Sequence, residues 1–280
     1  GKHLDTSGYD LMGVVTGSEG LLGVITEVTV RILPMPPAAR AILIGFCSSE
    51  AAGNCVAAII GAGIIPGGME MMDRKAIHAV EEFVHAGYPL SVEALLIVEL
   101  DGLEEEVEFL TKRVGQIARD SGASLVQASR NEEERLLFWA GRKAAFPAIG
   151  RVSPDYYCMD GTIPRGKLAQ VLKEIGRLSK KYNLPVANAF HAGDGNLHPL
   201  IMYDANEKNA LEKTEKFGAD ILKYCVKIGG VLTGEHGVGV EKRELMCEMF
   251  NNNDIQQQIK IKRALDASSL LNPGKVYPIL

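Results

Sequence analysis

Two histidines lie at the ends of a short, glycine-rich stretch, His191-Ala-Gly-Asp-Gly-Asn-Leu-His198, and a second stretch, Gly234-Glu235-His236-Gly237, follows further along the chain. The glycines permit a tight turn with positive φ, which can bring both imidazoles of the first stretch to a common point. Two imidazoles and a carboxylate suit a divalent ion such as Zn²⁺ or Mn²⁺, and a further histidine beside the carboxylate can act as a base. The first stretch alone would normally be interpreted as two polar loop histidines with no shared ligand. Together they predict a metal-assisted active site.

Three other features could bind a ligand. The run Gly17-Ser18-Glu19-Gly20-Leu21-Leu22-Gly23 has glycines at three-residue spacing, which lets a flat or phosphorylated ligand approach the backbone, although a plain turn has the same composition. Arg142 lies close to the only tryptophan and could hold a carboxylate through two hydrogen bonds, although most arginines on helices are solvated. The stretch Asn272-Pro273-Gly274-Lys275 is a turn by composition.

The composition is that of a globular protein. The chain has 280 residues, 46% of them apolar and 23% charged, which is enough for one large domain or two smaller ones. A net charge of -5 without any basic block argues against nucleic acid as a partner. No apolar run reaches the length of about 18 residues that crosses a bilayer, so we expect a soluble protein. Five widely spaced cysteines indicate structural thiols in a reducing, cytoplasmic compartment.

Apolar periodicity predicts a chain of alternating strands and helices. An alternating strand at 24–33 ends in Pro34-Met35-Pro36-Pro37, where we expect a domain boundary. Further strands are expected at 41–46, 68–72, 94–100, 156–159, 185–190 and 197–203. Helices are expected at 50–62, 73–85, 103–117, 131–143, 165–182, 207–228 and 255–265. This order favours an α+β fold in which helices cover one face of a largely antiparallel sheet, because no Gly-x-Gly-x-x-Gly motif supports a Rossmann sheet.

Four motifs, taken in their order along the chain, resemble those of the FAD-linked oxidases of the vanillyl-alcohol oxidase superfamily, in particular the members that oxidise 2-hydroxy acids. The motifs are Gly17-Ser18-Glu19-Gly20-x-x-Gly23-Val24-Ile25-Thr26, His191-x-Gly193-Asp194-Gly195-Asn196-x-His198, Gly234-Glu235-His236-Gly237 and Asn272-Pro273-Gly274-Lys275. They extend over nearly the whole chain, so the likeness is specific.

The resemblance implies a protein with an FAD-binding domain followed by a substrate or cap domain built from ferredoxin-like elements. Residues 1–37 would be the end of the FAD-binding domain, 38–232 the substrate domain and 233–280 a segment that returns to the flavin. The glycine-rich pyrophosphate loop of the family is missing, so we expect a fragment that holds FAD weakly and is inactive alone. The residues that resemble cofactor contacts are Gly17, Ser18, Glu19, Gly20, Gly23, Val24 and Asn272.

The same likeness assigns roles to the candidate site residues. His191, His198 and Glu235 resemble metal ligands, His236 resembles the base, and Arg142 resembles the anchor of the substrate carboxylate. The expected reaction removes the hydroxyl proton of a 2-hydroxy acid while the α-hydrogen passes as hydride to the flavin.

Two departures from the hydroxyglutarate-oxidising pattern bear on the substrate. Cys158 stands where that branch has a lysine, and Leu200 stands where a polar residue would follow the second histidine. A second carboxylate would therefore have few partners, which favours a small monocarboxylate, glycolate or D-lactate.

The resemblance also bears on partners and location. It implies other redox subunits, including an iron-sulfur subunit, which would place the protein at the inner face of the membrane, and it leaves a homo-oligomer open. The alternative function is a flavin-free metal-binding or subunit-assembly module, whose unpaired strand edges would recruit partners.

Overall fold

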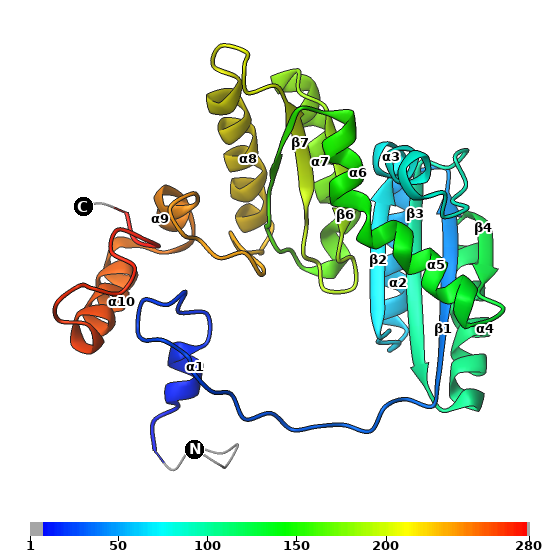
Figure 1. Ribbon diagram of the computed structural model, residues 1–280, viewed down its shortest axis with the longest axis horizontal. Helices are drawn as coiled ribbons and strands as arrows, with labels where there is room; N and C mark the ends of the chain where they lie inside the picture. Colours follow the sequence, from blue (N-terminus) through cyan, green and yellow to red (C-terminus); the bar gives the residue numbers. More distant parts are fainter. Residues whose placement is uncertain (1–7, 279–280) are drawn as a thin grey trace. The chain divides into compact units, whose positions relative to one another are not determined.

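The computed structural model describes residues 8–278, which form two compact units (Figure 1). Pro36–Gly234 form one unit, here called the sheet unit. Gly1–Met35 and Glu235–Leu280 form the other, here called the terminal unit, of which residues 1–7, 279 and 280 lie outside the described part. The predicted functions of segments 1–37, 38–232 and 233–280 stay predictions.

The sheet unit contains one antiparallel sheet with the strand order β4-β1-β3-β2-β6-β7-β5. The strands are β1 (Ala38–Phe46), β2 (Gly68–Asp73), β3 (Ala94–Gly102), β4 (Ala123–Ala128), β5 (Asp155–Cys158), β6 (Val186–Phe190) and β7 (Pro199–Tyr203). The prediction of an α+β fold with a largely antiparallel sheet is therefore confirmed.

The sheet consists of two related halves. The first runs β1-α2-β2-α3-β3-α4-β4, and the second runs β5-α7-β6-β7-α8, so each contains the split βαβ arrangement of ferredoxin-like folds. The helices of the sheet unit are α2 (Ser49–Gly61), α3 (Arg74–Val84), α4 (Glu104–Asp120), α5 (Glu132–Lys143), α6 (Ala145–Val152), α7 (Leu168–Tyr182) and α8 (Ala210–Lys227), with a 3-10 turn at Arg165–Lys167. The halves join where β2 pairs with β6, at Met71 opposite Phe190 and Met72 opposite Ala189.

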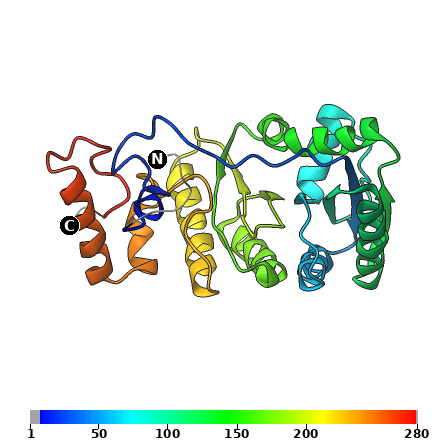
Figure 2. The ribbon, with the colours of Figure 1, turned by 90° about the horizontal axis from the view of Figure 1, so that it is seen from below.

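Helices cover both faces of the sheet, with α2, α4, α7 and α8 on one face and α3, α5 and α6 on the other (Figure 2). Ala41 and Leu43 of β1 pack in the cluster that contains the apolar residues of α3, α5 and α6. Ile42 and Ile44 point to the opposite face and are also buried. The expectation of one covered face was wrong, because a strand with an unbroken apolar run is buried on both sides.

Most predicted elements are present within a few residues of their expected bounds, and the misses have physical causes. The predicted strand at 24–33 is absent, and its side chains are exposed, for example Val24 at 78% and Ile32 at 87%. A strand needs a neighbour for its backbone hydrogen bonds, and none of residues 8–278 pairs with this segment. Strand β4 and helix α6 were not predicted, since their short apolar patterns follow directly on longer helices.

The terminal unit contains α1 (Leu11–Val15), a 3-10 turn at Arg243–Leu245, α9 (Met246–Met249) and α10 (Asn252–Leu265). A buried lysine of α10, Lys262, ties its segments together. The Lys262 ammonium donates to the carbonyl oxygens of Leu21 at 2.7 Å and Leu271 at 2.8 Å, and it pairs with the Asp266 carboxylate. Asp266 in turn accepts from the backbone N–H of Leu271 at 2.9 Å. The Lys262–Asp266 ion pair thus connects the glycine loop at 17–23 to the segment around Leu271.

The five cysteines are free thiols, as predicted. Burial raises the pKa of Cys55 to about 11 and that of Cys225 to about 12, so both thiols stay protonated near neutral pH and act as apolar core groups. Among the described residues, no helix combines the length and the apolar character that a membrane span requires.

The contact between the two halves provides a stability test. A Cβ at Gly53 of α2 would lie 2.8 Å from the backbone nitrogen of Ala169 in α7, whereas a Cβ at Gly176 of α7 would meet nothing within 4 Å. We expect Gly53→Ala to lower the free energy of unfolding by about 1 kcal/mol or more through overpacking. Gly176→Ala should raise it by about 0.5–1 kcal/mol through helix propensity. Urea unfolding measures both, and a stabilised Gly53→Ala protein would contradict the close helix contact.

Candidate functional site

The His191–His198 stretch is a tight turn between β6 and β7. The His191 carbonyl accepts from the N–H groups of Asp194 at 3.2 Å and Gly195 at 3.1 Å, and the His191 N–H donates to Asn196 at 3.1 Å. Gly195 has φ of +76°, and a Cβ there would lie 2.3 Å from the carbonyl oxygen of Ile163. Only glycine fits this position, as the turn predicted from sequence requires.

The turn brings the two imidazoles together. Their ring centroids are 5.0 Å apart with an interplanar angle of 87°. His198 is buried, and its Nδ1 lies 3.2 Å from the carbonyl oxygen of Met159. Because a carbonyl oxygen only accepts, this contact requires a proton on Nδ1 of His198. In a neutral imidazole the lone pair then lies on Nε2, the nitrogen that could bind a metal.

Glu70 of β2, which sequence reasoning missed, joins two of the predicted site residues. Its Oε1 lies 2.7 Å from Nδ1 of His191, and its Oε2 accepts from Nε of Arg142 at 2.8 Å. Glu70 and Arg142 are each only 7% exposed. A carboxylate between the apolar residues Met69 and Met71 was the available signal, since a buried charge requires a partner.

One hydrogen-bond donor of Arg142 has no partner among the described residues. Its Nη2 is buried and has no hydrogen-bond partner among residues 8–278. A buried N–H group without a partner costs free energy, and a guanidinium pairs best with a carboxylate or phosphate. Arg142 is therefore a candidate anchor for an anion, and the hydrogen bond of its Nε to Glu70 fixes the position of the guanidinium.

Asp160 is a second functional candidate that sequence reasoning missed. Its side chain is fully buried and accepts from the Thr233 hydroxyl and from the N–H of Gly234 at 3.1 Å. A carboxylate oxygen of Asp160 and a ring nitrogen of His198 lie within 4.8 Å of each other, as do that ring and the Cys158 sulfur. Imidazole and carboxylate form a donor set that suits Zn²⁺ or Mn²⁺.

Glu235 and His236 belong to the terminal unit, where His236 Nε2 lies 3.8 Å from Oε1 of Glu235. Both side chains are about half exposed. The predicted grouping of Glu235 with His191 and His198 around one ion stays a prediction, as does the role of His236 as a base.

Within the terminal unit, the predicted cofactor residues lie together around a hollow of about 770 Å³. Those that line it are Gly17, Ser18, Glu19, Gly20, Gly23, Val24 and Asn272. The Asn272 amide donates to the Glu19 carbonyl at 3.2 Å, and a Cβ at Gly20 would lie 2.5 Å from that amide nitrogen. Residues from both ends of the chain thus form one concave surface, and their contacts with FAD stay predictions.

The Glu19 side chain does not line this hollow as a free carboxylate. It accepts from the backbone N–H groups of Val238 at 2.7 Å and Gly239 at 2.9 Å. The Glu19 carboxylate therefore fixes the loop that follows His236. A ligand in the hollow would contact the backbone of the glycine loop instead of this carboxylate.

Comparisons with known proteins identify close relatives. Residues 35–276 match the family model described as "FAD linked oxidases, C-terminal domain". The chain is 55% identical over 277 residues to "Glycolate oxidase subunit GlcD" of Escherichia coli strain K12, covering 99% of this chain and 56% of that protein. It is 35% identical to the protein of the same name in Bacillus subtilis strain 168, covering 98% and 58%. It is 31% identical to "Probable D-lactate dehydrogenase, mitochondrial" of Danio rerio, covering 98% and 55%.

Solved structures share the fold at low sequence identity. A substrate-bound p-cresol methylhydroxylase matches with a TM-score of 0.67 and 15% identity, covering 87% of this chain and 53% of that one. An alkyldihydroxyacetonephosphate synthase matches with a TM-score of 0.63 and 18% identity, covering 95% and 49%. The chain spans about half the length of the curated relatives that it matches. Because the family model matches most of the sequence, the chain belongs to the FAD-linked oxidases and carries their C-terminal domain.

Proposed function

We propose that the protein containing this chain oxidises a small 2-hydroxy acid, glycolate or D-lactate, to the 2-oxo acid with FAD as the oxidant. The names of the relatives, glycolate oxidase subunit and D-lactate dehydrogenase, support this reaction class. The structural observation that carries the proposal is the buried Arg142 guanidinium, which has an unpartnered Nη2 and is held by Glu70 beside His191.

Arg142 binds the substrate carboxylate in this proposal. Glu70 occupies Nε and thereby fixes the plane of the guanidinium, so that the Nη2 group is presented in one orientation. When the substrate carboxylate binds, the Nη2 group of Arg142 gains a charge-assisted hydrogen bond, which is favourable because this buried donor otherwise has no partner. The buried Leu200 and the thiol of Cys158 offer little to a second carboxylate, which favours a monocarboxylate.

The histidines prepare the hydroxyl group for oxidation. His191, His198 and Glu235 would hold a divalent ion such as Zn²⁺ or Mn²⁺, which would supply positive charge beside the hydroxyl oxygen; Asp160 is a further ligand candidate. Glu70 orients His191 in the way that carboxylates orient metal-binding imidazoles. His236 removes the hydroxyl proton. When bound, FAD supplies the oxidation by accepting hydride from the α-carbon.

We also propose a binding site for FAD and redox partners for the intact protein. The residues that would hold part of FAD line the hollow of the terminal unit and are Gly17, Ser18, Glu19, Gly20, Gly23, Val24 and Asn272. We infer that turnover needs the parts of the relatives that this chain does not match. The word "subunit" in the names of two relatives supports assembly with other redox subunits. We propose that one of these is an iron-sulfur subunit and that the protein lies in the cytoplasm or at the inner face of the membrane.

The exposed apolar segment Val24–Met35 favours the second candidate function, a flavin-free metal-binding or assembly module. The visible absorbance of the purified intact protein separates the two. Flavin bands support the oxidase, and a colourless intact protein that still assembles with partners supports the module.

Replacing Arg142 tests the carboxylate anchor. In the intact protein, Arg142→Met should raise the KM for glycolate or D-lactate by about a hundredfold, because a charge-assisted hydrogen-bonded contact is lost. Arg142→Lys should recover only part of this, since an ammonium lacks the planar fork. Steady-state dye reduction measures both parameters. Arg130→Met, which removes a largely exposed arginine near the start of the same helix, is the control. An unchanged KM in Arg142→Met would remove Arg142 from substrate binding.

Metal content tests the histidine site. We expect His198→Ala and Glu235→Ala to lose most of the bound metal in elemental analysis. Glu70→Gln should keep the fold but weaken metal affinity by about tenfold to a hundredfold, as outer carboxylate partners of metal ligands do. His78→Ala, an exposed histidine of α3 whose ring contacts the Leu90 carbonyl, is the matched control. Equal metal content in all four proteins would show that these residues bind none.

A further inference from the structure

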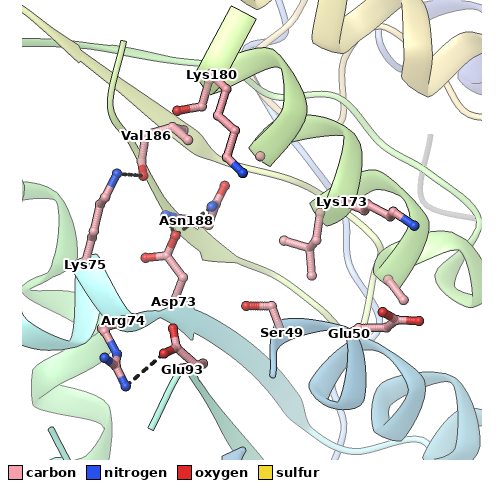
Figure 3. Close-up of a pocket in the computed structure, with 14 residues that line it drawn as sticks. Ser49, Glu50, Asp73, Arg74, Lys75, Glu93, Lys173, Lys180, Val186 and Asn188 are labelled. Carbon is pink, nitrogen blue, oxygen red and sulfur yellow. Dashed lines mark hydrogen bonds and ion pairs between the residues drawn. The ribbon is translucent and has the colours of Figure 1, made fainter. Parts of the chain in front are cut away.

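A second polar pocket lies in the sheet unit, between α2 and α7 and beside the junction of β2 with β6 (Figure 3). Its volume is about 530 Å³. None of the residues that line it has a role in the proposed oxidation, and the four sequence motifs lie elsewhere. The pocket therefore requires an explanation of its own.

The inner end of the pocket is formed by Asp73 and Asn188, just beyond the last ladder pair between β2 and β6. Oδ2 of Asp73 accepts from the backbone N–H of Asn188 at 3.1 Å and from its amide Nδ2 at 2.7 Å, and Oδ1 accepts from the N–H of Ala76 at 3.1 Å. Burial nevertheless raises the pKa of Asp73. These contacts fix the Asn188 amide with its nitrogen toward Asp73 and its oxygen directed away.

The Asn188 oxygen is an acceptor that lacks a donor. Asn188 is 7% exposed, and its Oδ1 is buried without a hydrogen-bond partner among residues 8–278. In Figure 3 this amide and the side chain of Lys180 point toward each other, but no hydrogen bond joins them. An unmet buried acceptor is costly, so a bound molecule with an O–H or N–H group would be stabilised here.

Lysines dominate the charge of the pocket. Arg74 and Glu93 neutralise each other in an ion pair of 2.9 Å. Lys75, Lys173 and Lys180 remain, against the carboxylates of Asp73 and Glu50. Lys75 donates to the Val186 carbonyl at 3.2 Å, and its charge also acts on the neighbouring Asp73 carboxyl. The three ammonium groups exceed the two carboxylates, so the pocket favours an anion, and the lysines are separate partners for its negative groups.

Helix α7 supplies an open wall for such an anion. Lys173, Gly176 and Lys180 are spaced by three and four residues, so they share one face of the helix, and the two lysines start roughly 10 Å apart along its axis. A Cβ at Gly176 would meet nothing within 4 Å. The absence of a side chain between the lysines leaves room for a molecule that bridges them.

We propose that this pocket binds a small hydroxy-polycarboxylate. Its carboxylates pair with Lys173 and Lys180 and are attracted by Lys75, and its hydroxyl donates to Oδ1 of Asn188. A phosphomonoester group fits less well, because its dianion, unlike a hydroxy acid, carries no O–H that could donate to the asparagine. This is a binding site additional to the one proposed for oxidation.

Isothermal titration of the purified chain with citrate, compared with tricarballylate, tests the proposal without any variant. The two tricarboxylates differ by the hydroxyl group alone. We expect citrate to bind, and tricarballylate to bind about tenfold or more weakly, because it leaves the Asn188 oxygen without a donor. Absence of citrate binding at millimolar concentration, or equal affinity for the two acids, would overturn the proposal.

Variants locate the site. Lys173→Gln and Lys180→Gln should each weaken citrate binding about tenfold. The control Lys213→Gln, in which an exposed lysine of α8 outside the pocket is changed, should leave it unaltered. Gly176→Leu should abolish binding by filling the pocket, while thermal unfolding confirms that the protein stays folded. Citrate binding that survives Gly176→Leu and both lysine changes would place it elsewhere. These readouts involve no flavin and no turnover, so they are independent of the proposed oxidation.

Discussion

The Glu70 carboxylate is the group on which the candidate site of the sheet unit depends. It is buried on β2 and contacts Arg142 from α5 and His191 from the turn after β6. Removing a carboxylate and a guanidinium from water costs free energy that their attraction largely offsets, so the pair adds little to stability. Its effect is on geometry, since one carboxylate sets the orientation of both partners. Without it, the Arg142 side chain would be a buried cation without its ion pair.

The short junction between β2 and β6 explains why this group lies where it does. Among residues 8–278, the ladder pairs between β2 and β6 involve only Met71 and Met72 of β2. Glu70 lies immediately before them and Asp73 immediately after, and each reaches across the junction through its side chain. Side-chain contacts of Glu70 and Asp73 thus add to the few backbone hydrogen bonds between β2 and β6. Both candidate sites lie at this junction because these contacts are polar.

The sequence predicted the parts of the molecule that follow local rules. The turn at His191–His198 follows from its glycines, and most strands and helices follow from apolar periodicity. The exposed segment at 24–33 has the same alternating pattern as a paired strand, and pattern alone does not reveal whether a neighbour is present. Glu70 and Asp160 were missed because their partners are distant in sequence, at Arg142 and Thr233. The sequence shows which polar residues are present. Which of them contact each other depends on how distant segments are arranged in the fold.

The two candidate sites beside β2 have opposite chemical requirements, and the strand geometry places them on different faces of the sheet. Successive strand residues point to opposite faces, so Glu70 and Asp73 lie on different sides of the sheet. Glu70 faces the layer with α5, and Asp73 borders the pocket lined by α2 and α7. The first site has a spare donor at Arg142 and the second a spare acceptor at Asn188. A carboxylate alone satisfies the first, whereas the second also needs a hydroxyl or amino group. The ligands proposed for the two sites would therefore lie on different faces of the sheet, and β2 and the segment 186–191, which contains β6, contribute residues to both sites.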